Sequence, residues 1–175
     1  LAFNQKILVE NPTVKIFTGK VMYDIIEEYQ RYVTEQREND LHLKLEQMTY
    51  PAKLQVIKGY IFRRSNPAIF GVRVIQGTLK PKVKVMNLYG KEIGVIEQIQ
   101  VQGETVQELK AGEEAAISIR DITIGRHIRE DEILYTLPKS NQINDLKKII
   151  NDPNDIKVLT EILQIRRKVE LMYGY

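Results

Sequence analysis

The periodicity of apolar residues changes near Tyr50, and this change constrains the fold most strongly. From Tyr50 to Leu137, short runs rich in β-branched residues alternate with turn signals. The expected strands cover residues 54–57, 71–75, 82–85, 93–101 and 115–119, and the expected turns lie at Asn66-Pro67, Gly77, Lys80-Pro81, Tyr89-Gly90, Gly103 and Ala111-Gly112. Short strands at this spacing, without helices between them, predict a closed antiparallel β-barrel over residues 49–137.

A long helix is expected before the barrel, over residues 19–48. Thr18 is a suitable N-cap, and apolar side chains recur at helical spacing between residues 21 and 33. Residues 34–40 are polar on every side, which is typical of a helix that crosses solvent between domains. The alternative is a pair of ordinary helices broken near Asn39.

The two ends of the chain complete the expected organisation. Residues 1–18 contain one short β-like run, 14–17, and are interpreted as the remnant of a preceding domain. The start without methionine is expected of a fragment. Residues 138–175 should form a helical hairpin, whose second helix begins with Asp152-Pro153 as N-cap and first position. The predicted fold class is mainly β with helical appendages.

Composition and motifs exclude several functions. The chain contains no cysteine and two histidines, which excludes disulfides and thiolate sites, disfavours zinc and fits a reducing cytoplasm. No apolar run approaches the roughly 20 residues that a membrane-spanning helix needs. Phosphate loops, metalloprotease motifs and nucleophile elbows are all missing. The sequence therefore predicts a binding module without an enzyme site, metal or cofactor.

The net charge of +3 is the sum of two opposed blocks. Between Gln47 and Lys91 there are nine Lys and Arg residues and no Asp or Glu, whereas residues 92–137 contain ten acidic residues against four basic ones. A surface that lies against phosphates gains from such an acid-free stretch. We therefore expect an electrically two-sided barrel, whose basic side and neighbouring loop bind nucleic acid through Arg63, Arg64, Phe70, Arg73, Lys82, Lys84, Arg126 and His127. Tyr60, Phe62 and Phe70 would offer stacking surfaces beside the charges. The alternative is that the aromatic residues are core and the charges only a solvated exterior.

The last helix carries more apolar residues than one stripe needs. One line contains Val158, Ile162, Ile165, Val169 and Met172, and an adjacent line contains Ile156, Leu159 and Leu163. One line could pack inward while the other binds a partner, although both could equally cover the core. The partner-binding candidates are Lys147, Lys148, Leu159, Leu163, Arg166, Arg167 and Lys168.

Several segments resemble one family of translation factors. The run Val14-Lys15-Ile16-Phe17-Thr18-Gly19 and the run 23–29 resemble the end of the third domain and the start of the long helix in archaeal and eukaryotic initiation factor 5B, the relative of bacterial initiation factor two. Further matches to its fourth domain follow in order at Pro51-Ala52-Lys53-Leu54, Tyr60-Ile61-Phe62-Arg63, Ile69-Phe70-Gly71-Val72 and Gly125-Arg126-His127.

This resemblance implies a barrel like the second domain of elongation factor Tu and a role in joining ribosomal subunits. The barrel would contact the aminoacylated end of initiator tRNA, and the terminal helices would receive the acidic tail of initiation factor 1A. GTP and magnesium would be bound only in an upstream G domain. The alternative function is a small stand-alone barrel enzyme with an unrecognised active site.

Overall fold

The computed structural model describes residues 22–175, and the expected N-cap and short strand before them lie outside the described residues. Two compact units can be distinguished, residues 1–47 and 48–175. In the first, α1 (Met22–Gln47) is one continuous helix of 26 residues. It passes through Asn39 without interruption, so the alternative of two helices broken there is wrong. Its middle section, residues 34–40, is exposed on every side.

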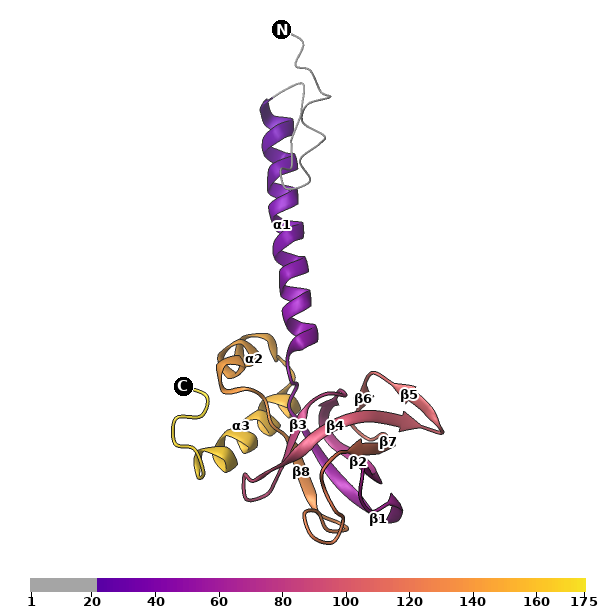
Figure 1. The fold of residues 1–175 in the computed structure, drawn as a ribbon. Helices are drawn as coiled ribbons and strands as arrows, with labels where there is room; N and C mark the ends of the chain where they lie inside the picture. Colours follow the sequence, from indigo (N-terminus) through magenta and orange to yellow (C-terminus); the bar gives the residue numbers. More distant parts are fainter. Residues whose placement is uncertain (1–21) are drawn as a thin grey trace. The chain divides into compact units, whose positions relative to one another are not determined.

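The second unit contains an antiparallel β-sheet that closes on itself (Figure 1). Its strands are β1 (Ala52–Arg63), β2 (Ala68–Leu79), β3 (Lys84–Asn87), β4 (Glu92–Val101), β5 (Glu104–Val106), β6 (Leu109–Lys110), β7 (Glu114–Ile119) and β8 (Ile133–Thr136). The order β1-β8-β3-β4-β7-β2 forms a ring, because β2 also pairs with β1. The short strands β5 and β6 are attached to β4 and β2 outside this ring. The predicted antiparallel barrel is confirmed.

The ring is closed unevenly. The β1–β2 pair extends along almost the whole of both strands, whereas β8 pairs with β1 and with β3 over three residues each. Thr136 strengthens the short seam, since its Oγ1 accepts the N–H of Ala52 and donates to the carbonyl of Tyr50, both at 2.8 Å. Inside the ring, Leu54, Val72, Ile99 and other aliphatic side chains from all the long strands form one core.

The expected and observed strands differ at several places, and the short strands β5 and β6 were not expected. Lys82 has φ +63° in a turn before β3, so it is not a strand residue as predicted. Gly77 also has a positive φ but lies inside β2, where its missing Cβ leaves room for the carbonyl of Pro51. The sequence pattern missed β8 because three of its four side chains, on both faces, are buried and show no alternation.

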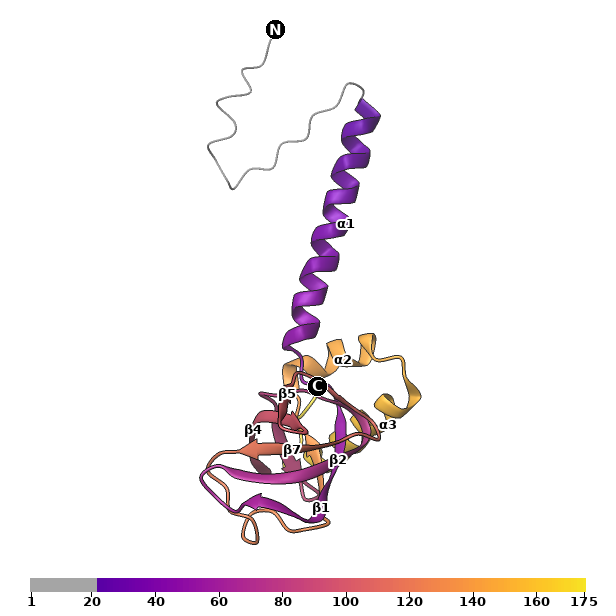
Figure 2. The same cartoon turned by 90° about the vertical axis from the view of Figure 1, so that its right-hand side faces the viewer.

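Two helices follow the barrel, as predicted. A 3-10 turn, η1 (Ser140–Gln142), leads into α2 (Ile143–Ile149), and α3 (Pro153–Arg167) begins where Asp152 Oδ1 accepts the N–H of Asn154 at 2.7 Å. Figure 2 shows α2 and α3 together on one side of the barrel. α3 packs against β1 and β2. None of the helices in the described part of the chain is long and apolar enough to span a membrane.

The segment after α3 folds back onto α2. Tyr173 is buried and its hydroxyl donates to the carbonyl of Pro138. Arg167 Nε donates to the carbonyl of Tyr173 at 2.9 Å, and the guanidinium lies 4.2 Å from the ring centre of Tyr175. α3 therefore ends earlier than its apolar pattern predicts, and Met172 lies in an irregular segment that these contacts hold in place.

Candidate nucleic-acid interface

The basic and acidic blocks of the barrel pair with each other across neighbouring strands. Three such ion pairs are Lys82–Glu97 at 2.7 Å, Lys84–Glu92 at 3.0 Å and Arg73–Glu114. They form because β3 lies beside β4, and β2 beside β7. The hydrogen bond from Lys82 lowers the pKa of Glu97. The expectation of an electrically two-sided barrel is therefore wrong, and three of the predicted phosphate-binding cations already have carboxylate partners.

Three cations at the far end of β1 stay unpaired. Lys58, Arg63 and Arg64 are exposed and form no ion pair within residues 22–175. An unpaired guanidinium can bind a phosphate without first releasing a carboxylate. This end of β1 is therefore better suited to a phosphate backbone than Arg73, Lys82 or Lys84.

A bulge in β1 sets the direction of these side chains. From the pair Val56–Val72 to the pair Ile61–Phe70, β1 advances five residues while β2 advances two. Gly59, with φ +81°, lies in the bulge, and its N–H donates to Glu130 Oε2 at 3.0 Å. The three extra residues change which face of β1 points inward.

The same bulge projects two aromatic side chains outward. Tyr60 is 58% exposed and Phe62 is 65% exposed, whereas Phe70 is fully buried in the core. Tyr60 lies over Gly71. A Cβ added to Gly71 would lie 2.9 Å from the Cβ of Tyr60. The prediction that Phe70 is a stacking surface is therefore wrong, and Tyr60 and Phe62 are the accessible rings.

These rings border an apolar groove of about 770 Å³ between β1, β2, β7 and the β4–β5 hairpin. Ile57, Ile69 and Val101 line it together with the two rings. Phe62 also lines the adjacent shallow hollow that contains Arg63 and Arg64. Stacking surfaces and unpaired cations thus lie side by side, as single-stranded nucleic acid requires. We call residues Lys58, Tyr60, Phe62, Arg63 and Arg64 the aromatic–basic patch.

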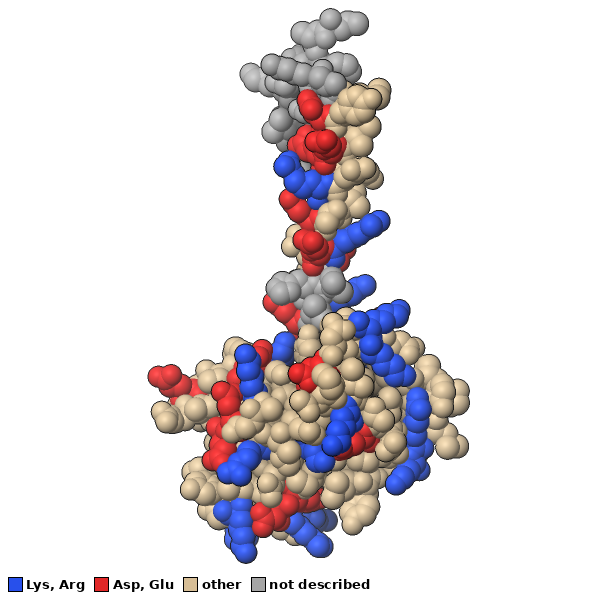
Figure 3. Space-filling view, turned by 180° about the vertical axis from the view of Figure 1, so that it is seen from behind, with Lys and Arg blue, Asp and Glu red and all other residues tan. Residues whose placement is uncertain are grey.

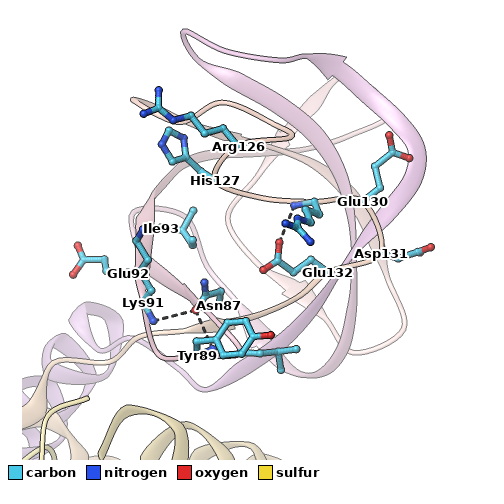
Figure 4. Close-up of a pocket in the computed structure, with 12 residues that line it drawn as sticks. Asn87, Tyr89, Lys91, Glu92, Ile93, Arg126, His127, Glu130, Asp131 and Glu132 are labelled. Carbon is cyan, nitrogen blue, oxygen red and sulfur yellow. Dashed lines mark hydrogen bonds between the residues drawn. The ribbon is translucent and has the colours of Figure 1, made fainter. Parts of the chain in front are cut away.

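Arg126 and His127 lie on a separate, tightly folded loop. His127 Nδ1 accepts the N–H of Thr123 at 2.9 Å, and Gly125 N–H donates to the carbonyl of Ile128 at 2.8 Å. Figure 4 shows Arg126 and His127 side by side on one rim of a pocket, with Tyr89 and other residues of the β3–β4 turn opposite. The loop lies next to Arg64, since Ile124 N–H donates to the Arg64 carbonyl at 2.9 Å, but Arg126 and His127 line a different pocket from Arg63.

The predicted partner-binding residues of the terminal helices divide into two groups. Leu159 and Leu163 are buried together with Val158 and Ile162 of the other apolar line, since the middle of α3 uses both lines to cover the barrel. Arg166 is mostly buried and donates to the carbonyl of Gly90 at 2.7 Å. Arg167 is engaged with the segment after α3. The prediction of a free apolar line is wrong, and both arginines have structural contacts.

Three lysines of the terminal helices remain available. Lys147, Lys148 and Lys168 are exposed and have no carboxylate partner among the described residues. Figure 3 shows Lys and Arg side chains in succession down the side formed by α2 and α3, with few acidic side chains between them. Beside them, Leu171 and Met172 are exposed. This side can attract an acidic partner that carries apolar residues.

Comparison with known proteins agrees with this geometry. The family profile described as Elongation factor Tu domain 4 matches residues 50–135, which is the barrel. The barrel is therefore of the kind found in translation factors of the elongation factor Tu class.

Whole-chain similarity is more specific. The chain is 40% identical to a probable translation initiation factor IF-2 from Ignicoccus hospitalis and 42% identical to one from Staphylothermus marinus, each over 99% of this chain and 30% of the relative. The crystal structure of GDP-bound aIF5B from Aeropyrum pernix matches 92% of this chain and 28% of that chain, with a TM-score of 0.71 and 36% identity. The chain belongs to the archaeal IF-2/aIF5B family of translation initiation factors. It spans less than a third of the length of these relatives.

Proposed function

We propose that this part of the factor binds the aminoacylated acceptor end of initiator tRNA and thereby supports the joining of ribosomal subunits. The observation that carries the proposal is the aromatic–basic patch, where exposed Tyr60 and Phe62 stand next to unpaired Arg63 and Arg64. The end of a tRNA is single-stranded, so its bases can stack on aromatic rings while its phosphates meet guanidinium groups. GTP and magnesium would be bound by another part of the whole factor.

The apolar groove beside Tyr60 gives the proposal a chemical direction. The side chain of an esterified methionine is apolar and unbranched at its Cβ, which suits a groove lined by Ile57, Ile69 and Val101. Deacylated (uncharged) tRNA lacks the methionyl group. Aminoacylated initiator tRNA should therefore bind more tightly than the deacylated form.

The test is a titration of the chain with charged and uncharged initiator tRNA at several salt concentrations. Arg63→Ala with Arg64→Ala should lower the affinity and reduce the slope of log K against log salt by up to about 1.4, because about 0.7 counterions are released per single-strand phosphate contact. Lys82→Ala with Lys84→Ala is the matched control, since it also removes two positive charges, but ones that are already ion-paired.

The two double variants separate the possible outcomes. A larger effect of the Lys82/Lys84 pair than of the Arg63/Arg64 pair would contradict the position of the interface. Tyr60→Ala with Phe62→Ala should reduce the preference for charged tRNA, because these rings border the groove. Equal binding of charged and uncharged tRNA by the unaltered chain would contradict recognition of the amino acid.

The terminal helices support a second contact, with the acidic tail of initiation factor 1A. It rests on exposed and unpaired Lys147, Lys148 and Lys168 beside exposed Leu171 and Met172. Lys147→Glu with Lys148→Glu should slow association and weaken its salt dependence, whereas Leu171→Ser with Met172→Ser should shorten the lifetime of the complex. Lys110→Glu, on the barrel, is the control. Unchanged tail binding by both double variants, measured by calorimetry, would contradict this assignment.

A further inference from the structure

A polar pocket lies between the β3–β4 turn and residues 126–132; it shares Glu130 with the hollow that contains Arg63 and Arg64, but no residue of the aromatic–basic patch lines it. Its volume is about 490 Å³, and its lining mixes three cations, Lys91, Arg126 and Arg129, with four carboxylates. A site for phosphate alone would exclude the carboxylates, since each one weakens anion binding. The mixed lining instead fits a ligand that presents both hydrogen-bond donors and negative charge.

The carboxylates of the pocket differ in direction. Glu130 is bound to the N–H of Gly59 and Glu92 is paired with Lys84, and both point away from the pocket in Figure 4, as Asp131 does. Glu132 points inward, with its Oε2 fixed by the N–H of Arg129 at 2.7 Å. One oriented acceptor, Glu132 Oε1, therefore faces the ligand.

Two side chains that line the pocket each keep one donor free. Asn87 Oδ1 accepts the N–H groups of Tyr89 and Lys91, both at 3.0 Å, which fixes the amide and leaves Nδ2–H for a ligand. His127 Nδ1 accepts the N–H of Thr123, so the neutral ring carries its proton on Nε2. Neither donor has a partner among the described residues.

The rim supplies a stacking surface and charge. Tyr89 is 81% exposed, and Lys91, Arg126 and Arg129 form no ion pair within residues 22–175. Nothing in the fold of these residues explains an exposed tyrosine at the tip of the turn, because Asn87 holds the turn without it. An aromatic face beside cations is the arrangement that binds an unpaired nucleotide.

We propose that this pocket binds one unpaired guanine nucleotide of an RNA. Guanine carries adjacent N1–H and N2–H donors next to the O6 acceptor, which complements one carboxylate beside amide and imidazole donors. Tyr89 stacks on the base, and Lys91, Arg126 and Arg129 neutralise the flanking phosphates. An acidic peptide fits less well, because Glu132 would repel its carboxylates. Initiator tRNA and ribosomal RNA share the required chemistry, and this contact is independent of the aromatic–basic patch.

The probe is GMP, titrated into the 175-residue chain and followed by calorimetry and NMR, with AMP as the matched ligand. GMP should bind about ten-fold more tightly than AMP, in keeping with the discrimination that one paired hydrogen-bond edge provides. Glu132→Gln keeps the shape and an acceptor for Arg129 N–H, so it should remove the preference for GMP without unfolding the loop. Tyr89→Ala should weaken both nucleotides, and Tyr23→Ala, an exposed tyrosine on α1, should weaken neither.

Two results would overturn the proposal. One is a failure to select the nucleotide, seen as equal affinity for GMP and AMP or as binding of an acidic peptide to the pocket instead of a nucleotide. The other is an unchanged affinity of Tyr89→Ala for both initiator tRNA and ribosomes. Loss of affinity for tRNA alone would identify tRNA as the source of the nucleotide, and loss for ribosomes alone would identify ribosomal RNA.

Discussion

Lys53 on β1 lies 3.0 Å from Glu161 on α3, and the hydroxyl of Tyr135 on β8 donates to the same carboxylate oxygen at 2.8 Å. The three residues connect β1 and β8, which pair with each other over only three residues, to the last helix. Burial raises the pKa of Glu161, but hydrogen bonds from Tyr135 and Lys53 outweigh it and hold the pKa below its ordinary value. These contacts of α3 therefore contribute to the stability of the barrel.

Glu161→Gln should lower the free energy of unfolding by about 1 kcal/mol, because a half-buried hydrogen bond loses its charge. The loss should be largest near neutral pH. The folded-state pKa of Glu161 is lowered, so its contribution is present above the ordinary pKa and disappears as pH falls through the folded value. Urea unfolding at several pH values measures this. A double-mutant cycle with Lys53→Met that shows no coupling would contradict it.

Asp155 should have the opposite pH dependence. Burial and the nearby charge of Asp152 raise its pKa above the ordinary value, so the ionised form destabilises the folded state. Stability from this group is greatest below its unfolded pKa and falls as pH rises through the folded one. Asp155→Asn should therefore stabilise the protein at pH 7 more than at low pH. Asp152→Ala is the contrasting variant, because loss of its N-cap should cost about 1 kcal/mol.

Gly71→Ala should disturb the aromatic–basic patch. The added Cβ would approach Tyr60 Cβ to 2.9 Å, so the bulge in β1 must shift. We expect a loss of about 1–3 kcal/mol in the free energy of unfolding, as for other overpacked sites. Tyr60→Gly removes the opposing Cβ, and the double variant should recover part of the loss. Thermal unfolding of the four proteins tests this, and additive effects would contradict the contact.

Gln36→Pro should interrupt α1 while leaving the barrel intact. Proline removes one backbone donor and clashes with the preceding turn, which costs about 3 kcal/mol in a helix interior. The fall in helical circular dichroism should come without a change in the unfolding midpoint of residues 48–175, which form their own compact unit. Gln36→Ala is the control. An equal loss of barrel stability would show that this stretch of the helix is packed against the rest of the protein.

Local pattern predicted most of the fold. The β-branched runs marked five strands, and the Asp152-Pro153 pair marked the start of α3. Turn chemistry was less decisive, because a glycine with positive φ occurs inside a strand as well as in a turn, as Gly77 does in β2, where it makes room for the carbonyl of Pro51.

The candidate site was less predictable, because strand neighbours decide which charges are free. The acid-free block predicted phosphate binding by Arg73, Lys82 and Lys84 as much as by Arg63. Only the pairing of the strands shows that Arg73, Lys82 and Lys84 form ion pairs with carboxylates. The bulge at Gly59 also changes which side chains of β1 point into the core. The sequence could therefore name three aromatic residues beside charge, while only the structure shows that Tyr60 and Phe62 are exposed and Phe70 is buried.

The hydrogen bonds of Thr136 to Ala52 and Tyr50 set the order of events when the protein is made. These partners are separated by 84 and 86 residues, so the barrel cannot close until β8 has left the ribosome. During that interval the first half of the barrel emerges with nine positive charges and without the carboxylates that later pair with Arg73, Lys82 and Lys84. The positive charge of this stretch is therefore neutralised by its own chain only after the later strands have been synthesised.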